Sequence, residues 1–164
     1  MRHWLTMTFA VLTLTLLGIS PALAQEPLTP ASLSPCPFTP AEIESALGVS
    51  VEDGQAADMS FPGGRDVGCL YPVKGSDTVL SVRQTWDPAS ADSAGQGTAK
   101  VAEGRLHAIP GDPDGAQWKV GGKDEPSAEL TYARGKIRTR VLIHGATVRE
   151  SDMQPRLLRL KRVP

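Results

Sequence analysis

The two cysteines, Cys36 and Cys69, are the residues of this chain with the most definite chemistry. Their spacing is far longer than the Cys-x-x-Cys pattern of redox-active pairs, which argues against a catalytic thiol. Two cysteines of a small domain in an oxidising compartment usually pair with each other. We therefore predict a structural disulfide that ties the start of a first helix to the middle of a first strand.

The histidines and acidic residues show no spacing typical of a metal centre. His107 and His144 lack the short separations that zinc sites use. One group of acids could suggest calcium instead: Asp112, Asp114, Asp124 and Glu125. The alternating ligands closed by a bidentate glutamate are missing, however, so residues 111–115 are interpreted as a tight turn.

Catalytic motifs are also missing from the sequence. It contains no Gly-x-Ser-x-Gly elbow, no phosphate-binding loop and no dinucleotide fingerprint. Glu42 and Glu44 are predicted to be exposed, whereas paired carboxylates need burial to act as acid and base. We therefore expect no catalytic residue, no cofactor and no metal, and a protein that is not an enzyme.

The net charge of −1 argues against nucleic-acid binding. Charge is nevertheless distributed unevenly along the chain. Residues 134–164 hold nine basic and two acidic side chains, and residues 25–92 hold three basic and ten acidic ones. Either the two regions attract each other in the fold, or a basic face binds an anionic partner. Arg138 and Arg140 are the candidate interaction residues, since alternate positions of a strand share a face.

The first 24 residues have the order of a secretory signal peptide: a charged start, an apolar run and a small-x-small site. Cleavage is expected between Ala24 and Gln25. A retained anchor is the alternative, but the run is shorter than the roughly twenty residues that a span needs. A lipoprotein would carry a cysteine where Gln25 stands. We predict export, a flexible tether at residues 25–35 and a single domain at residues 36–164.

A capping box predicts a short helix at residues 39–47. The Thr39 hydroxyl and the Glu42 carboxylate can each accept the other residue's backbone N–H. Pro40 suits the first helical position, and Gly48 suits the end of the helix. Such a short helix must pack on another element to be stable.

Alternation of apolar and β-branched residues predicts strands at 67–73, 78–86, 116–120, 128–133 and 136–144. Residues 74–77 connect the first two as a hairpin, and Gly135 supplies the positive φ of a tight turn between the last two. We expect an antiparallel meander with one solvent-facing side, and hence an α+β fold. A second helix is predicted at residues 150–164, capped by Ser151, with Pro155 in its first turn.

Three large apolar side chains allow more than one interpretation. Met59 and Phe61 lie in a segment predicted as a loop, which we expect to fold over the core; an exposed contact patch is the alternative. Trp118 is expected to anchor the core, and a ligand platform is its alternative.

A recurrent pattern links these elements. Cys36 precedes a capped helix that ends in Leu-Gly (residues 47–48), and Gly-Cys-Leu-Tyr follows at residues 68–71. Further along, Gly-Asp-Pro-Asp-Gly-Ala-Gln-Trp (residues 111–118) precedes a hairpin. The pattern resembles small exported bacterial envelope domains of unknown function, many of them lipoproteins of actinobacterial type. This chain departs from it by lacking the lipobox cysteine and by an insertion in the Gly-Asp element. The resemblance implies a helix on an antiparallel sheet, a disulfide and no known catalytic residues.

These features together predict a periplasmic or extracellular binding domain. Its expected partner is a protein or an anionic envelope component, with no nucleic acid and no membrane span after cleavage. Two alternatives stay open. One is a sensor that holds a small ligand between helix and sheet, and the other is an inhibitor of an exported enzyme that uses residues 59–64.

Overall fold

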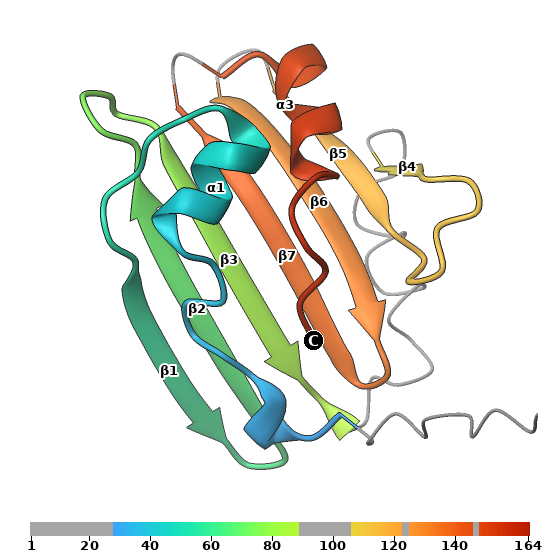
Figure 1. Ribbon diagram of the computed structural model, residues 1–164. Coiled ribbons are helices and arrows are strands. Elements are labelled where there is room, and N and C mark those ends of the chain that lie inside the picture. The colour runs from blue at the N-terminus through green and yellow to red at the C-terminus, as the bar shows by residue number, and fades with distance from the viewer. Residues whose placement is uncertain (1–27, 89–105, 123–124, 146–147) are drawn as a thin grey trace, which may run out of the picture.

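The computed structural model describes residues 28–88, 106–122, 125–145 and 148–164. The predicted signal peptide, with its cleavage position at Ala24 and Gln25, lies outside these residues. Within them, the chain forms a seven-stranded antiparallel sheet with two short helices against one face (Figure 1). The fold is therefore β-rich, and the α+β prediction holds in part.

The strands do not follow one another as a simple meander. They are β1 (Gln55–Phe61), β2 (Gly64–Pro72), β3 (Val79–Trp86), β4 (Leu106–Ala108), β5 (Gln117–Gly122), β6 (Glu125–Arg134) and β7 (Ile137–His144). Their spatial order is β1-β2-β3-β7-β6-β5-β4. After β3 the chain passes to the far edge and returns strand by strand, so that β7 pairs with β3. The expected meander is thus two meanders joined by one long-range pairing.

Alternation along the central strands divides the sheet into two faces. In β7, Ile137, Thr139 and Val141 are buried, and the residues between them are more exposed. β3 behaves in the same way, with Leu80 and Val82 buried. The buried positions face the helices, because successive side chains of a strand point to opposite sides.

Helix α1 (Pro40–Leu47) forms as its sequence predicts. The Glu42 N–H donates to the Thr39 hydroxyl at 3.3 Å, and the Thr39 N–H donates to the Glu42 carboxylate at 2.8 Å. Gly48 ends the helix with a φ of 71°. Arg156 donates to the Leu47 carbonyl at 2.8 Å, which places a cation at the negative end of the helix.

Helix α3 (Glu150–Leu157) differs from its prediction at its start. The N-cap is Arg149 instead of Ser151, with no side-chain cap hydrogen bond, and Pro155 lies inside the helix instead of in its first turn. Packing compensates for the missing cap, because Leu157 is buried in the same core as α1.

The predicted disulfide joins Cys36 to Cys69 of β2, with a Cα–Cα distance of 5.0 Å. Beside it, the fully buried Tyr71 hydroxyl accepts the Phe38 N–H at 3.2 Å and donates to the Phe38 carbonyl at 3.0 Å. The segment that precedes α1 is therefore fixed to β2 by one covalent bond and two hydrogen bonds.

The segment predicted as a tether is described from residue 28 onward, and this part packs on the sheet. Pro30–Ser32 form a short 3-10 turn, and Leu33 is buried against Val67 and Ile137. Arg65 donates to the Pro30 carbonyl at 2.8 Å. This part of the segment is thus held by contacts with the sheet.

Strand β1 occupies a segment that was expected to be a loop. It forms a hairpin with β2, in the register Met59 opposite Asp66 and Phe61 opposite Gly64. Met59 and Phe61 are therefore strand residues, and they are exposed instead of folded over the core. Neither helix of the described residues is long and apolar enough to cross a membrane.

Candidate interaction surface

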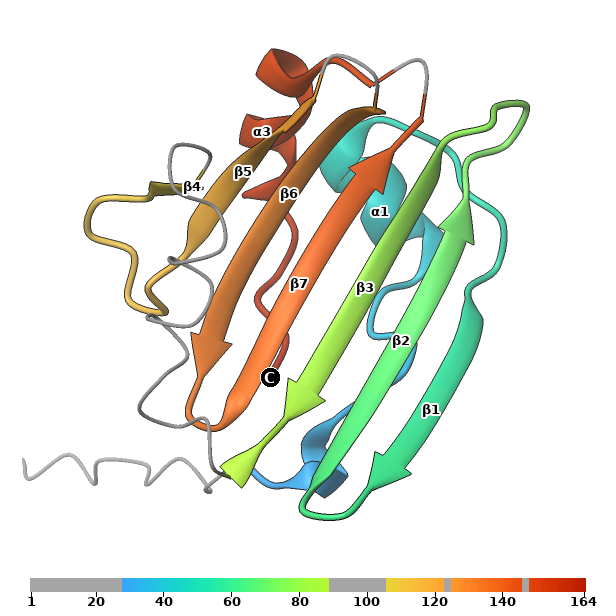
Figure 2. The ribbon, with the colours of Figure 1, turned by 180° about the vertical axis from the view of Figure 1, so that it is seen from behind.

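The sheet face opposite the helices is here called the open face. Neither α1 nor α3 crosses it, as the view from behind shows (Figure 2). Its side chains come from the alternate positions that the core does not use. On the central strands these are Asp66, Gly68 and Leu70 of β2, Ser81, Arg83 and Thr85 of β3, Arg138, Arg140 and Leu142 of β7, and Glu129 and Thr131 of β6.

Two arginines lie opposite each other near the centre of this face. Arg83 of β3 is the cross-strand neighbour of Arg140 of β7. Their side chains are 62% and 45% exposed, so both guanidinium groups are accessible. Like charges placed directly opposite each other destabilise a sheet, which makes this pair a candidate for function.

A carboxylate on the neighbouring strand pairs with each arginine. Arg83 forms an ion pair with Asp66, with Nε 2.8 Å from Oδ2, and Arg140 Nη2 lies 2.8 Å from Glu129 Oε2. Both carboxylates are only 12% exposed. The Asp66 carboxylate raises the pKa of the Arg83 guanidinium through its hydrogen bonds. The charges form a row, positive at the centre and negative at both ends.

Arg138 adds a third cation beside this row. It lies opposite Thr85 of β3, two positions from Arg140 along β7. Within the described residues its buried Nε makes no hydrogen bond, and its guanidinium belongs to no ion pair. Since three arginines share two carboxylates here, the centre of the open face is cationic.

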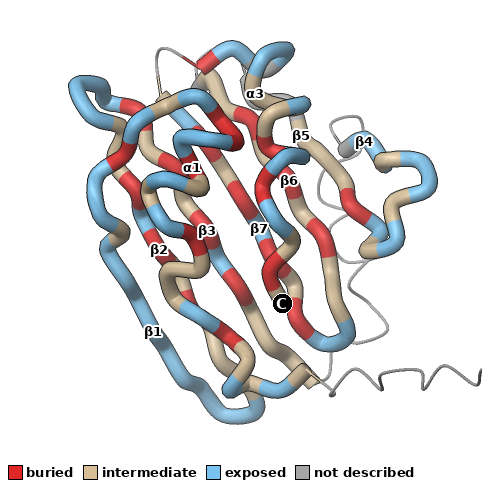
Figure 3. Tube along the Cα trace, in the orientation of Figure 1, coloured by how far each residue is buried: buried red, intermediate tan, exposed pale blue. Residues whose placement is uncertain are grey.

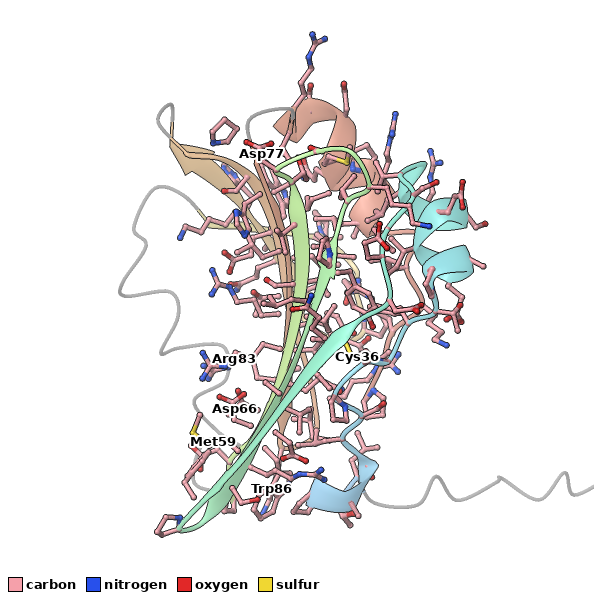
Figure 4. All side chains as sticks on the ribbon, turned by 90° about the vertical axis from the view of Figure 1, so that its left-hand side faces the viewer. Cys36, Met59, Asp66, Asp77, Arg83 and Trp86 are labelled. Atoms are coloured by element: carbon pink, nitrogen blue, oxygen red, sulfur yellow. A yellow bond between two sulfur atoms is a disulfide. The ribbon has the colours of Figure 1, made fainter. Side chains whose placement is uncertain are left out.

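A hollow of about 620 Å³ adjoins the arginines over β1, β2 and β3. Ala57 and Gly68 lie opposite each other at its floor and leave room because they have small side chains or none. Leu70 and Met59 line it as exposed apolar side chains, and Arg83 lines it as a charged group. Figure 4 shows Met59, Asp66 and Arg83 on the same side of the sheet, opposite Cys36.

The structure brings the two arginines predicted from sequence to one face. Arg138 and Arg140 both lie on the open face of β7. Three other basic residues of the region 134–164 form ion pairs elsewhere: Arg134 pairs with Asp114, Arg162 with Asp112, and Lys161 with Glu42. The Lys161 pair joins the acid-rich and base-rich regions of the chain.

The residues considered for metal binding are separated or already paired. His107 stacks on Trp118 with ring centroids 4.1 Å apart, and His144 ends β7. Asp112 Oδ1 accepts the backbone N–H groups of Asp114 and Ala116, as expected for a turn. The described residues hold no cluster of three potential ligands. Asp124 lies outside the described residues, and Glu125 begins β6.

Three residues of the surface could not be identified from the sequence: Arg83, Asp66 and Glu129. The predicted strands at 78–86 and 128–133 contain Arg83 and Glu129, whereas the one at 67–73 begins just after Asp66; alternation alone places Arg83 away from the core. The neighbour that makes Arg83 notable is Arg140, and this neighbour depends on the pairing of β3 with β7. No local sequence signal encodes that pairing.

No protein-family model matches the chain, and no curated protein shows significant sequence similarity to it. The candidate function therefore rests on the residues of the chain and on their geometry.

Proposed function

We propose that this protein is an exported, non-enzymatic binding domain whose open face binds an acidic region of a partner protein. The observation that carries the proposal is the cross-strand pair of Arg83 and Arg140, flanked by Arg138. Guanidinium groups bind carboxylates through two parallel hydrogen bonds, so this cluster suits acidic side chains. The N-terminal sequence pattern supports export, and the disulfide is compatible with it.

The hollow beside the arginines favours a protein over the other anionic partners. An anionic polymer or a lipid head group would use the charges but would leave the apolar surface of Leu70 and Met59 unoccupied. A protein surface can place carboxylates on the arginines and an apolar side chain over Ala57 and Gly68. Interfaces of this kind combine an apolar centre with a polar rim.

The same hollow supports a second candidate, a module that binds a small amphipathic anion. Its volume lies within the range of small-molecule sites. The location differs from the expectation, because the space between α1 and the sheet is occupied by Ile43, Leu47 and Tyr71. A medium-chain fatty acid is a suitable probe, and a rise in the melting temperature that is lost in Gly68→Leu would favour this candidate.

Site-specific photo-cross-linking tests the proposed protein partner. A photoreactive amino acid at Ser81 would lie on the open face between Leu70 and Leu142. The matched control carries it at Ala41, which is exposed on α1 at the helical side of the sheet. Both variants are irradiated in the native exported fraction, and the adducts are identified by mass spectrometry.

We expect one adduct from position 81. It should not form when the irradiation is carried out at high salt, because exposed charges are then screened. The adduct is expected to be missing from position 41. Equal cross-linking from both positions, or an adduct that still forms during irradiation at high salt, would contradict the proposal.

A further inference from the structure

Strand β1 is a free edge of the sheet in the described part of the chain. It pairs with β2 on one side, and all seven of its residues are exposed (Figure 3). Proteins usually protect such edges by short strands, lysines or prolines. The opposite edge strand, β4, has only three residues. β1 is longer and contains neither lysine nor proline, so its backbone can accept a further strand.

The one charged residue of β1 is neutralised within the subunit. Asp58 forms an ion pair with Arg65 of β2, with Nη2 2.5 Å from Oδ2. This ion pair lowers the pKa of the Asp58 carboxyl. The edge therefore presents no unpaired charge that would repel a second copy of itself.

Exposed apolar side chains gather beside this edge. Met59 is 64% exposed, Phe61 42% and Leu70 47%, and the strand registers place all three on the open face. An apolar patch at a free strand edge is typical of an interaction site.

We propose that β1 pairs with β1 of a second copy of this chain, antiparallel and centred on Met59. The occupant is inferred from self-complementarity. A two-fold axis normal to the sheet pairs residues of the same face, so the axis must lie midway between the two copies of one residue. With the two Met59 residues facing each other across the axis, Phe61 faces Ala57 of the second copy, and the Asp58 carboxylate faces the hydroxyl of Ser60.

Registers centred nearer the start of β1 are less favourable. A centre at Asp58 would place the two Asp58–Arg65 ion pairs side by side and Phe61 opposite the polar Gln55 of the second copy. A centre at Ala57 would place Phe61 opposite Asp53 of the second copy. Beyond Phe61, Pro62 lacks the N–H that a longer ladder would need.

This pairing goes beyond the proposed function, and it would double the number of arginine clusters that a partner meets. A two-fold axis normal to the sheet leaves both open faces on the same side of one continuous sheet. The dimer would then present two arginine clusters to one partner surface. Two linked contacts strengthen binding without any new interaction at either site.

Sedimentation analysis over a range of protein concentrations tests the dimer. We expect a reversible dimer for the wild type and an at least tenfold weaker one for Met59→Lys, because a charge at the edge opposes strand pairing. Thr131→Lys is the matched control, since it adds the same charge to the open face of β6, away from the edge. A monomer at every concentration, or equal dimerisation of Met59→Lys, would overturn the proposal.

Cysteine cross-linking tests the register without relying on affinity. Facing residues of an antiparallel pair lie about 4.5–5.5 Å apart at Cα, within the range of a disulfide. Met59→Cys is therefore expected to form a covalent dimer on mild oxidation, and Ala57→Cys is not. Cross-linking through Ala57→Cys in place of Met59→Cys would overturn the register. Loss of the dimer with intact partner binding would leave the proposed function standing.

Discussion

Glu42 shows how a single residue can support both a helix and a tertiary contact. Its carboxylate accepts the Thr39 N–H and forms an ion pair with Lys161, whose Nζ lies 2.5 Å away. The hydrogen bond from Lys161, followed by that from Thr39, lowers the pKa of Glu42 from 4.5 to about 2. The sequence predicts the cap, but the contact with Lys161 requires the C-terminal segment to pack beside α1.

The stability that this carboxylate contributes depends on pH with a definite sign. A group whose pKa is lower in the folded state stabilises the fold above its unfolded pKa, and this contribution is lost as the pH falls toward the folded value. Glu42→Gln should therefore lower the free energy of unfolding at neutral pH. Between pH 4.5 and about 2, the variant should also lose stability less steeply than the wild type.

Denaturant titrations across this pH range measure the effect. Glu52→Gln is the control, because Glu52 is exposed and belongs to no ion pair among the described residues. The control removes a carboxylate without removing either contact of Glu42. An unchanged slope in Glu42→Gln would show that its two contacts are not formed in solution.

At the scale of elements, the disulfide brings three segments together at Gly54. A Cβ atom at Gly54 would clash with the Sγ atom of Cys69, and it would lie 2.7 Å from Tyr71 Cε1 and 2.8 Å from Cys36 Sγ. Residue 54 must therefore lack a side chain because the approach to β1 passes directly over the disulfide.

Gly54→Ala should destabilise the protein by about 1–3 kcal/mol, the usual cost of overpacking a filled site. Gly68→Ala is the matched control, since its Cβ would meet its nearest neighbour at 3.6 Å, an ordinary contact. Its stability should stay within about 1 kcal/mol of the wild type. Chemical denaturation compares the two, and equal stability would contradict the close packing at Gly54.

The elements differ in how well the sequence predicts them. α1 carries a complete set of local signals, namely Pro40, the capping box and Gly48, and it forms as expected. β1 reads Gln-Ala-Ala-Asp-Met-Ser-Phe, which lacks β-branched residues and has little alternation. It becomes a strand because β2 provides a partner. α3 forms with a proline inside it because the core, not its cap, stabilises it.

At the scale of the whole molecule, contacts between distant segments decide the arrangement. The segment after α3 runs back across the sheet (Figure 1), where the Pro164 carbonyl accepts hydrogen bonds from Gln84 at 2.5 Å and Thr139 at 2.9 Å. The Tyr132 hydroxyl accepts the Val163 N–H at 3.0 Å. Both Gln84 and Thr139 are buried polar residues, and this segment satisfies them.

The candidate site depends on another contact between distant segments, the pairing of β3 with β7. The sequence places Arg138 and Arg140 on one face of a strand, but only the tertiary fold adds Arg83. In the described part of the chain, four of the nine basic residues at 134–164 form ion pairs, among them Arg162 with Asp112. Arg83 and Arg140 of the open face stay accessible, and the central claim is that the open-face arginines bind an acidic partner.

The most direct test measures, by titration calorimetry, the affinity of the protein for the purified partner that the cross-linking experiment identifies. Three purified proteins are compared: the wild type, the Arg83→Gln/Arg140→Gln double variant, and Arg159→Gln, which removes an exposed charge at the helical side. Charge pairs at an interface contribute on the order of 1.5 kcal/mol or more each, so the double variant should bind about 100-fold more weakly. Arg159→Gln should bind as the wild type does. Equal affinity of the double variant and the wild type would contradict the account.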